Sequence, residues 1–217
     1  MTRKRAPAIT CLFLDIGGVL LTDGFDHHAR QRAAAHFDLD LADMEERHHL
    51  TFEPYEEGKV TLDEYLNRVI FCRKQPFTRA QFRQFLFAQS KPYTEMLNLF
   101  RTLKMQYGLK IVAVSNEARE LNAFRIRKFK LDAIVDAFIS SCFVHLRKPD
   151  ADIFRLALDV AQVPARQIVF VDNTPMFVQI AERLGMGGIL HVNYKTTRQK
   201  LTSFGLQLGD GDTHDAG

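Results

Sequence analysis

Apolar runs that end in polar residues alternate with helical patterns over much of the chain. Four such runs predict buried strands, at residues 11–21, 112–116, 134–143 and 167–173. The first run carries Asp15, and the flexible pair Gly17-Gly18 follows at once, so the strand should end on a carboxylate and a turn. A helical pattern follows each run. Repeated βα units of this kind predict a mostly parallel sheet in an α/β fold.

Polar side chains stand where these strands end. They are Asp15, Ser115, Lys148 and Asp172, which span most of the sequence. In a parallel sheet the carboxyl ends of the strands share one edge, and open α/β sheets bind their ligands there. We therefore expect these four side chains to converge at one site.

Between the first and second runs, residues 23–91 show helical patterns and little strand pattern. Helices are predicted over Phe25–Phe37, Leu41–Leu50, Thr61–Cys72 and Thr78–Gln89. Asp40 and Thr61 are suited to be N-caps, and Glu64 completes a capping box with Thr61. The region is therefore predicted to be a four-helix insert, after which a helix at Tyr93–Tyr107 resumes the main domain.

Length, composition and charge set the class of protein. With 217 residues, of which 46 % are hydrophobic, the chain can form one domain with a small insert. A net charge of +3 is mild, and no nucleic-acid partner is expected. The densest basic stretch is predicted to be a solvated helix face: Arg119, Arg125, Arg127, Lys128 and Lys130.

Targeting and cysteine patterns favour a cytoplasmic protein without a membrane partner. No stretch approaches the ~20 apolar residues of a membrane span, and no long apolar segment follows the basic N-terminus. Cys11, Cys72 and Cys142 lie far apart and favour reduced core residues over a disulfide or zinc site. The polar, glycine-rich residues 209–217 are expected to form a disordered tail.

The ordered motifs resemble those of the haloacid dehalogenase (HAD) superfamily, in its phosphatase-like branch. Asp15-Ile-Gly-Gly-Val-Leu is similar to the nucleophile motif, and Ser115-Asn116, Lys148-Pro149 and Asp172-Asn173 are similar to the three later motifs. The spacings also agree, and the resemblance extends from about Thr10 to about Leu206. It implies a three-layer α/β/α sandwich with a Rossmann-like sheet, formed by residues 1–22 and 92–208, and a helical cap formed by residues 23–91.

The resemblance also implies the chemistry. Asp15 would be the nucleophile that holds an aspartyl-phosphate, and Mg²⁺ would be bound by Asp15, the backbone carbonyl of Gly17 and Asp172. Lys148 would hold Asp15 and the phosphate by charge, and Ser115 would bind a phosphate oxygen. The residues expected to contact phosphate are Gly18, Ser115, Asn116 and Lys148.

Two positions depart from the family pattern. Typical phosphatases of the superfamily carry a second Asp two residues after the nucleophile, as a general acid, and this chain has Gly17 there. Asn173 follows Asp172 where relatives usually have a second Asp, which should weaken Mg²⁺ binding. If the acid alone is missing, Gly17→Asp should raise the phosphatase rate.

Three functions remain open at this point. The first is a Mg²⁺-dependent phosphatase of a small phosphorylated metabolite; the second is carbon–halogen or carbon–phosphorus cleavage, with Lys59 or Lys74 as the nearest Schiff-base lysines of the insert. The third is a catalytically weak or inactive binding protein. Either a monomer or a homodimer is compatible with the sequence. Side chains of the insert that could contact substrate are His27, His28, His48, His49, Tyr55 and Glu56.

Overall fold

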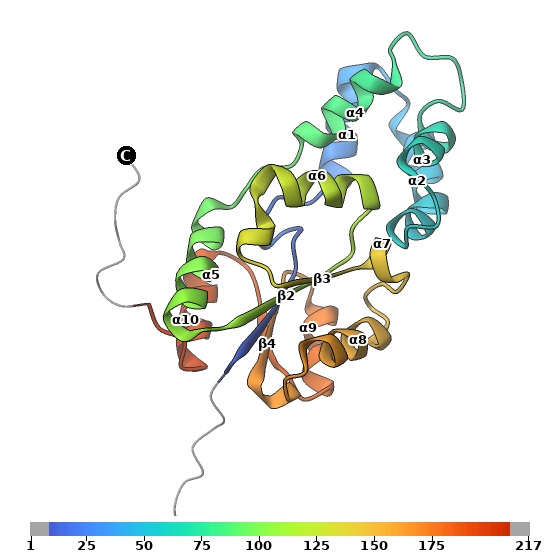
Figure 1. Cartoon of the computed structure of the whole chain (residues 1–217). Helices are drawn as coiled ribbons and strands as arrows, with labels where there is room; N and C mark the ends of the chain where they lie inside the picture. Colours follow the sequence, from blue (N-terminus) through green and yellow to red (C-terminus); the bar gives the residue numbers. More distant parts are fainter. Residues whose placement is uncertain (1–8, 209–217) are drawn as a thin grey trace, which may run out of the picture.

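Buried apolar runs form a parallel sheet in the computed structural model, which describes residues 9–208 (Figure 1). Within these residues the sheet has five strands in the order β3-β2-β1-β4-β5. Their bounds are β1 (Cys11–Leu14), β2 (Lys110–Ser115), β3 (Ala137–Ser140), β4 (Ile168–Asp172) and β5 (Gly187–Leu190). The predicted α/β class with a mostly parallel sheet is confirmed.

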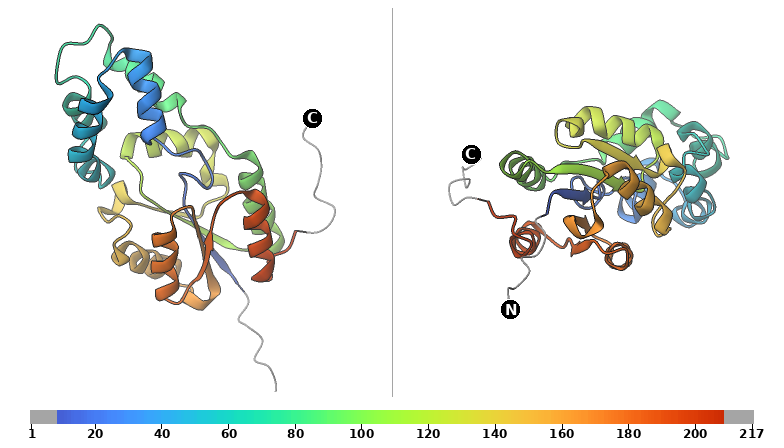
Figure 2. Two further views of the ribbon diagram at one scale, coloured as in Figure 1. Left: turned by 180° about the vertical axis from the view of Figure 1, so that it is seen from behind. Right: turned by 60° about the horizontal axis from the view of Figure 1, so that its bottom comes forward.

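Helices cover both faces of the sheet, because successive strand residues point to opposite sides. Leu12 and Leu14 pack toward α5 (Thr94–Tyr107), α6 (Arg119–Phe129) and α10 (Tyr194–Ser203). Cys11 and Phe13 pack toward α8 (Ala151–Ala161) and α9 (Pro175–Arg183). Figure 2 shows the sheet between these two helical layers. Three short helices lie in the connections between strands and longer helices: η1 (Leu131–Ala133), α7 (Ser141–Val144) and η2 (Ala165–Gln167).

Strand β1 lies at the point where the strand order reverses. Its neighbours are β2 and β4, paired in parallel with Leu14 opposite Ala113 on one side and Val171 on the other. The three strands therefore end at the same level. Asp15, which follows β1, lies at the switch point where sheets of this kind bind ligands.

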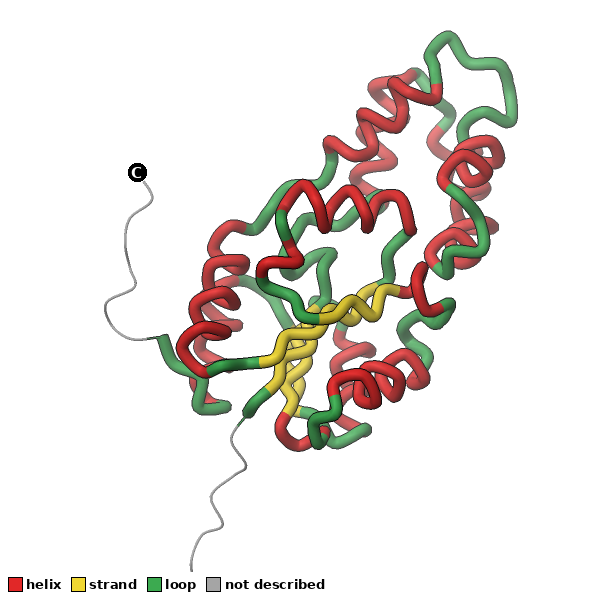
Figure 3. Tube along the Cα trace, viewed as in Figure 1, coloured by secondary structure: helices red, strands yellow, loops and turns green. Residues whose placement is uncertain are grey.

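Five helices lie between β1 and β2, and the first four of them form the insert. Figure 3 shows that this part of the chain contains helices and loops. The helices of the insert are α1 (His27–Phe37), α2 (Leu41–Glu56), α3 (Leu62–Val69) and α4 (Arg79–Ala88). The predicted N-caps are confirmed, since Asp40 accepts from two amides of α2 and Thr61 forms a capping box with Glu64. Helix α2 extends beyond the predicted end at Leu50 and reaches Glu56.

The insert packs around an apolar cluster in which Phe82 of α4 is fully buried, and Ala118 and Leu121 of the main domain are part of the same cluster. Five phenylalanine rings surround it, with centroids between 5.1 and 6.5 Å away: Phe25, Phe37, Phe71, Phe77 and Phe85. Edge-to-face and offset contacts of this kind stabilise aromatic clusters. The cluster therefore packs the four helices together and also against the main domain.

Some features differ from the sequence prediction. Strand β5 was not predicted because it begins with Gly187-Gly188; a Cβ at either position would lie within 2.7 Å of Phe204 or Glu182. The third run forms a strand only over β3 and then turns into α7. Cys72 is exposed, so its prediction as a core residue is wrong. The predicted tail at 209–217 lies outside the described residues.

No helix within residues 9–208 is long and apolar enough to cross a membrane.

We predict that Phe82→Ala will lower the free energy of unfolding by about 3–5 kcal/mol, because it leaves a cavity among the surrounding rings. Urea unfolding followed by circular dichroism measures this. The matched control is Leu50→Ala, since Leu50 is 72 % exposed and its truncation should change stability by less than about 0.5 kcal/mol. Equal effects of the two variants would contradict the packing described here.

Candidate active site

Four polar side chains from distant parts of the chain meet at the carboxyl edge of the sheet. Asp15 follows β1, Ser115 ends β2, Asp172 ends β4, and Lys148 lies in the loop between α7 and α8. All four are buried; Lys148 and Asp172 are fully so. The convergence expected from the sequence is present in the structure.

The two carboxylate oxygens of Asp15 have different partners. Its Oδ1 accepts hydrogen bonds from the Ser115 hydroxyl at 2.6 Å and from the Ile16 amide at 2.8 Å. Its Oδ2 lies 3.0 Å from Lys148 Nζ. One oxygen is thus fixed by neutral donors, and the other faces a buried cation.

Lys148 joins the carboxylates of Asp15 and Asp172. Its Nζ lies 2.6 Å from Asp172 Oδ2, and the Thr174 amide donates to Asp172 Oδ1 at 2.7 Å. Burial lowers the pKa of Lys148, but attraction to both carboxylates outweighs this and leaves that pKa raised. Burial and the negative charge of Asp15 raise the pKa of Asp172 to about 6. The site therefore holds more negative charge than Lys148 alone neutralises.

Asn116 and Gly18 shape the loops of the site. The Asn116 side chain donates to the Lys148 carbonyl and accepts from the Lys148 amide, both at 2.8 Å, so it braces the Lys148 loop. Gly18 has a φ of +71°, and a Cβ there would lie 2.0 Å from Asn173 Nδ2. The Gly18 amide already donates to the Leu21 carbonyl at 2.8 Å, which leaves Gly18 a turn-forming role.

A cavity of about 370 Å³ opens above Asp15, between the sheet edge and the insert. Of the six insert residues proposed as substrate contacts, His48, Tyr55 and Glu56 line this cavity, whereas His27, His28 and His49 are not among its lining residues. The wall combines charged side chains with aromatic ones, which are Phe25, Phe52, Tyr55, Tyr65 and Phe177.

The insert is held against the main domain beside this cavity. Arg147, directly before Lys148, pairs with Glu53 at 2.9 Å and Glu56 at 2.8 Å, and its guanidinium lies over the Phe52 ring. Next to it, a Cβ at Gly58 would lie 2.4 Å from the Cys142 carbonyl oxygen, so the two backbones approach closely. The wall that α2 contributes is therefore tied to the loop that carries Lys148.

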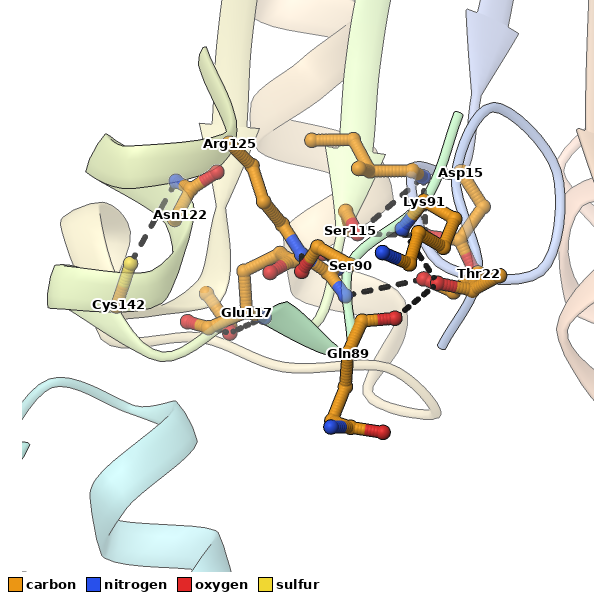
Figure 4. Close-up of polar contacts among 12 residues, drawn as sticks. Asp15, Thr22, Gln89, Ser90, Lys91, Ser115, Glu117, Asn122, Arg125 and Cys142 are labelled. Atoms are coloured by element: carbon orange, nitrogen blue, oxygen red, sulfur yellow. Dashed lines mark hydrogen bonds and ion pairs between the residues drawn. The ribbon is translucent and has the colours of Figure 1, made fainter. Parts of the chain in front are cut away.

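Two linkers connect the insert to the main domain, and they run side by side. The Thr22 amide donates to the Lys91 carbonyl and the Thr22 hydroxyl to the Gln89 carbonyl, both at 2.9 Å. Arg125 of α6 binds both linkers: it donates to the Thr22 carbonyl and to the Ser90 hydroxyl, each at 3.0 Å (Figure 4). One side chain of the main domain thus fixes both entry and exit of the insert.

Glu117 balances the charge of Arg125. The two side chains are almost fully buried, and Arg125 Nη1 lies 2.6 Å from Glu117 Oε1. Burial raises the pKa of Glu117 to about 7, although the attraction of Arg125 opposes it. The prediction that the basic stretch of α6 is solvated is wrong for Arg125. The position of Arg125 along the helix could have indicated its burial, because Leu121, Asn122 and Arg125 share the buried face of α6.

Asp23 is a residue that the sequence analysis did not select. It lines the same cavity as Asp15 and Gly17. Its Oδ1 lies 3.3 Å from the point where a Cβ on Gly17 would be. Desolvation of the carboxyl group, with the negative charges of Asp26 and Asp15, raises the pKa of Asp23. No local pattern marks Asp23, because its proximity to Gly17 depends on the path of the first linker.

We predict that Arg125→Met will lower the free energy of unfolding by about 3–5 kcal/mol, because the buried Glu117 must then either stay charged without a partner or take up a proton. Urea unfolding at neutral pH measures this. Arg127→Met, at an exposed position on the same helix, is the control and should have little effect. Adding Glu117→Gln to Arg125→Met should restore part of the loss; if the double variant is no more stable, the ion pair is not the cause.

We predict that His48 makes the protein more stable as pH rises from about 4 to 6.5. Burial and the nearby Arg30 lower the His48 pKa from 6.5 to about 4, so the unfolded chain binds its proton first. This contribution is present above pH 6.5 and lost on acidification, with a slope of at most about 1.4 kcal/mol per pH unit. Unfolding free energies of wild type and His48→Gln across this range measure it. Parallel curves would contradict the assignment.

Two curated proteins resemble this chain, one over nearly its full length and the other over about two thirds of it. "Flavin mononucleotide hydrolase 1, chloroplatic" of Arabidopsis thaliana is 24 % identical over 209 residues, which are 96 % of this chain and 82 % of that protein. The sesquiterpene phosphatase astK of Aspergillus oryzae is 28 % identical over 142 residues, 64 % of this chain and 71 % of that protein.

The fold also matches that of a solved bacterial enzyme. The HAD family enzyme bt-2542 of Bacteroides thetaiotaomicron superposes with a TM-score of 0.74 at 17 % identity, covering 91 % of this chain and 99 % of that one. Another structure of the same enzyme contains magnesium and inorganic phosphate. The family model of the haloacid dehalogenase-like hydrolases matches residues 9–185. The protein described here therefore belongs to the haloacid dehalogenase-like hydrolases.

Proposed function

We propose that this hydrolase is a Mg²⁺-dependent phosphatase of a small phosphorylated metabolite, with Asp15 as its nucleophile. The observation that carries the proposal is the position of Asp15, which lines the cavity and whose Oδ2 lies 3.0 Å from the buried ammonium of Lys148. A carboxylate can attack phosphorus and so split one difficult displacement into two easier ones. Residues 23–91 would act as the cap that covers the site.

Each residue of the site has a part in this reaction. The Ser115 hydroxyl and the Ile16 amide hold Oδ1 of Asp15, so that Oδ2 is directed to the phosphorus. Lys148 stabilises the negative charge that gathers on the phosphate oxygens, and Ser115 lies close enough to Asp15 to share that task. Asn116 keeps Lys148 in place through its two bonds to the Lys148 backbone.

The donor set fits Mg²⁺. No cluster of three or more His, Cys, Asp or Glu side chains suited to a metal occurs within residues 9–208. Mg²⁺ prefers hard oxygen ligands and keeps several waters, so Asp15, Asp172 and the Gly17 carbonyl would suffice. Asp15 and Asp172 are two carboxylates that share the single ammonium of Lys148, so the group carries a net negative charge. A bound Mg²⁺ would supply positive charge to the carboxylates and the phosphate.

The cavity argues against the Schiff-base alternative. Lys59 is paired with Glu57 and its side chain is 59 % exposed, and neither Lys59 nor Lys74 lines the cavity. Arg30 and Arg147 also line the cavity, but their guanidinium groups are already paired with glutamates. The cavity thus favours a substrate with a single phosphate whose remaining part is apolar or aromatic. Two relatives are named a flavin mononucleotide hydrolase and a sesquiterpene phosphatase.

We predict that wild-type protein will release phosphate from members of a panel that includes FMN, sugar phosphates and prenyl phosphates, and only with Mg²⁺ present. Chelation by EDTA should abolish release and added Mg²⁺ should restore it, because the metal supplies the missing positive charge. Phosphate release measured colorimetrically tests this.

The mutational arm uses Asp15→Asn, which removes the nucleophile and should abolish release on every compound. Asp159→Asn, at an exposed position of α8, is the matched control and should retain full activity. If Asp15→Asn and the control behave alike on all compounds, the phosphatase proposal is wrong and a binding role is favoured.

A further inference from the structure

The loss of a carboxylate at position 17 leaves a gap in the reaction proposed above. When Asp15 attacks phosphorus, the bond to the leaving oxygen breaks and that oxygen needs a proton. In the second step, the attacking water must lose one. Positioned acid–base groups typically contribute ~10²–10⁴-fold to such steps. Gly17 has no side chain to provide this.

Another carboxylate fills the space beside Gly17. Asp23 Oδ1 lies 3.3 Å from the position of a Cβ on Gly17, and the Asp23 Cα lies 3.8 Å from it. A Cβ at position 17 would therefore be in tight contact with the Asp23 carboxylate. Both residues line the cavity above Asp15. The Asp23 carboxylate therefore lies in the region that a side chain at position 17 would enter.

Asp23 is also free for such a role. Asp26, three residues later, accepts a hydrogen bond from the Ala29 amide as the N-cap of α1. The Asp23 carboxylate, in contrast, makes no hydrogen bond or ion pair with any residue in the described range 9–208. It is exposed, so it can exchange protons with solvent. The fold thus gives Asp26 a structural use and leaves Asp23 without one.

The buried Arg125 fixes the backbone that carries Asp23. Arg125 Nη2 binds the carbonyl of Thr22, the preceding residue, at 3.0 Å. Thr22 is in turn bonded to Lys91 and Gln89 of the second linker. A carboxylate at the end of this braced linker has a defined position relative to Asp15, as an acid–base group requires.

We infer that Asp23 supplies the acid–base carboxylate of this site in place of a side chain at position 17; the inference rests on the proposed phosphatase function. In the first step Asp15 Oδ2 forms a bond to phosphorus, the bond to the leaving oxygen breaks, and that oxygen takes the proton of Asp23. In the second step water attacks phosphorus, its proton passes to the Asp23 carboxylate, and the Asp15–phosphorus bond breaks. Asp15 is regenerated and inorganic phosphate leaves.

The test compares Asp23→Asn with Asp159→Asn, at an exposed position of α8, on two substrates under single-turnover conditions with Mg²⁺. One is an alkyl phosphate, whose leaving oxygen needs a proton, and the other is p-nitrophenyl phosphate, whose leaving group does not. Asp23→Asn should slow cleavage of the alkyl phosphate by ~10²–10⁴-fold and that of p-nitrophenyl phosphate by less than about 10-fold. Asp159→Asn should match wild type on both, since Asp159 does not line the cavity.

An exchange variant separates function from structure. Gly17→Asp in the wild-type background crowds two carboxylates together and should bring no gain in rate. Gly17→Asp combined with Asp23→Ala removes the crowding, and it should recover at least about 10-fold over Asp23→Ala alone on the alkyl phosphate. Circular dichroism checks that each variant is folded.

The outcomes distinguish the inference from the proposed function. If wild type shows Asp15-dependent release but Asp23→Asn slows both substrates equally or neither, or the exchange variant recovers nothing, Asp23 is not the acid–base group. If wild type shows no Asp15-dependent release from any phosphate ester, the proposed function fails and the inference fails with it.

Discussion

One buried ammonium between two buried carboxylates is the interaction on which the rest of this site depends. Lys148 Nζ lies 3.0 Å from Asp15 and 2.6 Å from Asp172, so two negative charges share one positive charge. A buried ion pair is costly unless each charged group is also hydrogen-bonded, and here Ser115, Ile16 and Thr174 supply those bonds. Burial and the negative charge of Asp15 raise the pKa of Asp172. The net negative charge of the group favours the binding of a divalent cation.

The fold brings this group together through the order of its strands. Because β1 is paired with β2 on one side and β4 on the other, the residues that end these strands lie at one level. Lys148 reaches them from a loop that Asn116 braces and that Arg147 ties to the insert. The insert is fixed a second time at its linkers, where Arg125 binds both chains at once. The position of the cavity wall and the geometry of the charged group are therefore mechanically connected.

The sequence predicts the parts of this structure that have a local pattern. Apolar runs predict the strands that end at Asp15, Ser115 and Asp172, and polar caps predict the starts of α2 and α3. It does not predict the roles of Arg125 and Asp23. A charged side chain on a basic helix has no pattern that distinguishes burial from solvation except its place on the apolar face, and the partners of Arg125 come from linkers far away in the sequence. Asp23 is close to Gly17 only because the first linker folds back over the strand end. The sequence does not predict contacts that depend on the course of the backbone through the fold, because no periodic pattern of residues marks them.

In the proposed reaction the Asp15 carboxylate receives the phosphoryl group. The most direct measurement is to mix the protein with a radiolabelled phosphate ester and Mg²⁺, quench with acid within the first turnover, and map the label by peptide mass spectrometry. We predict an acid-stable, base-labile label on the peptide that contains Asp15. This label should be absent when EDTA is added. Turnover without any labelled intermediate, or a label on a different residue, would contradict it.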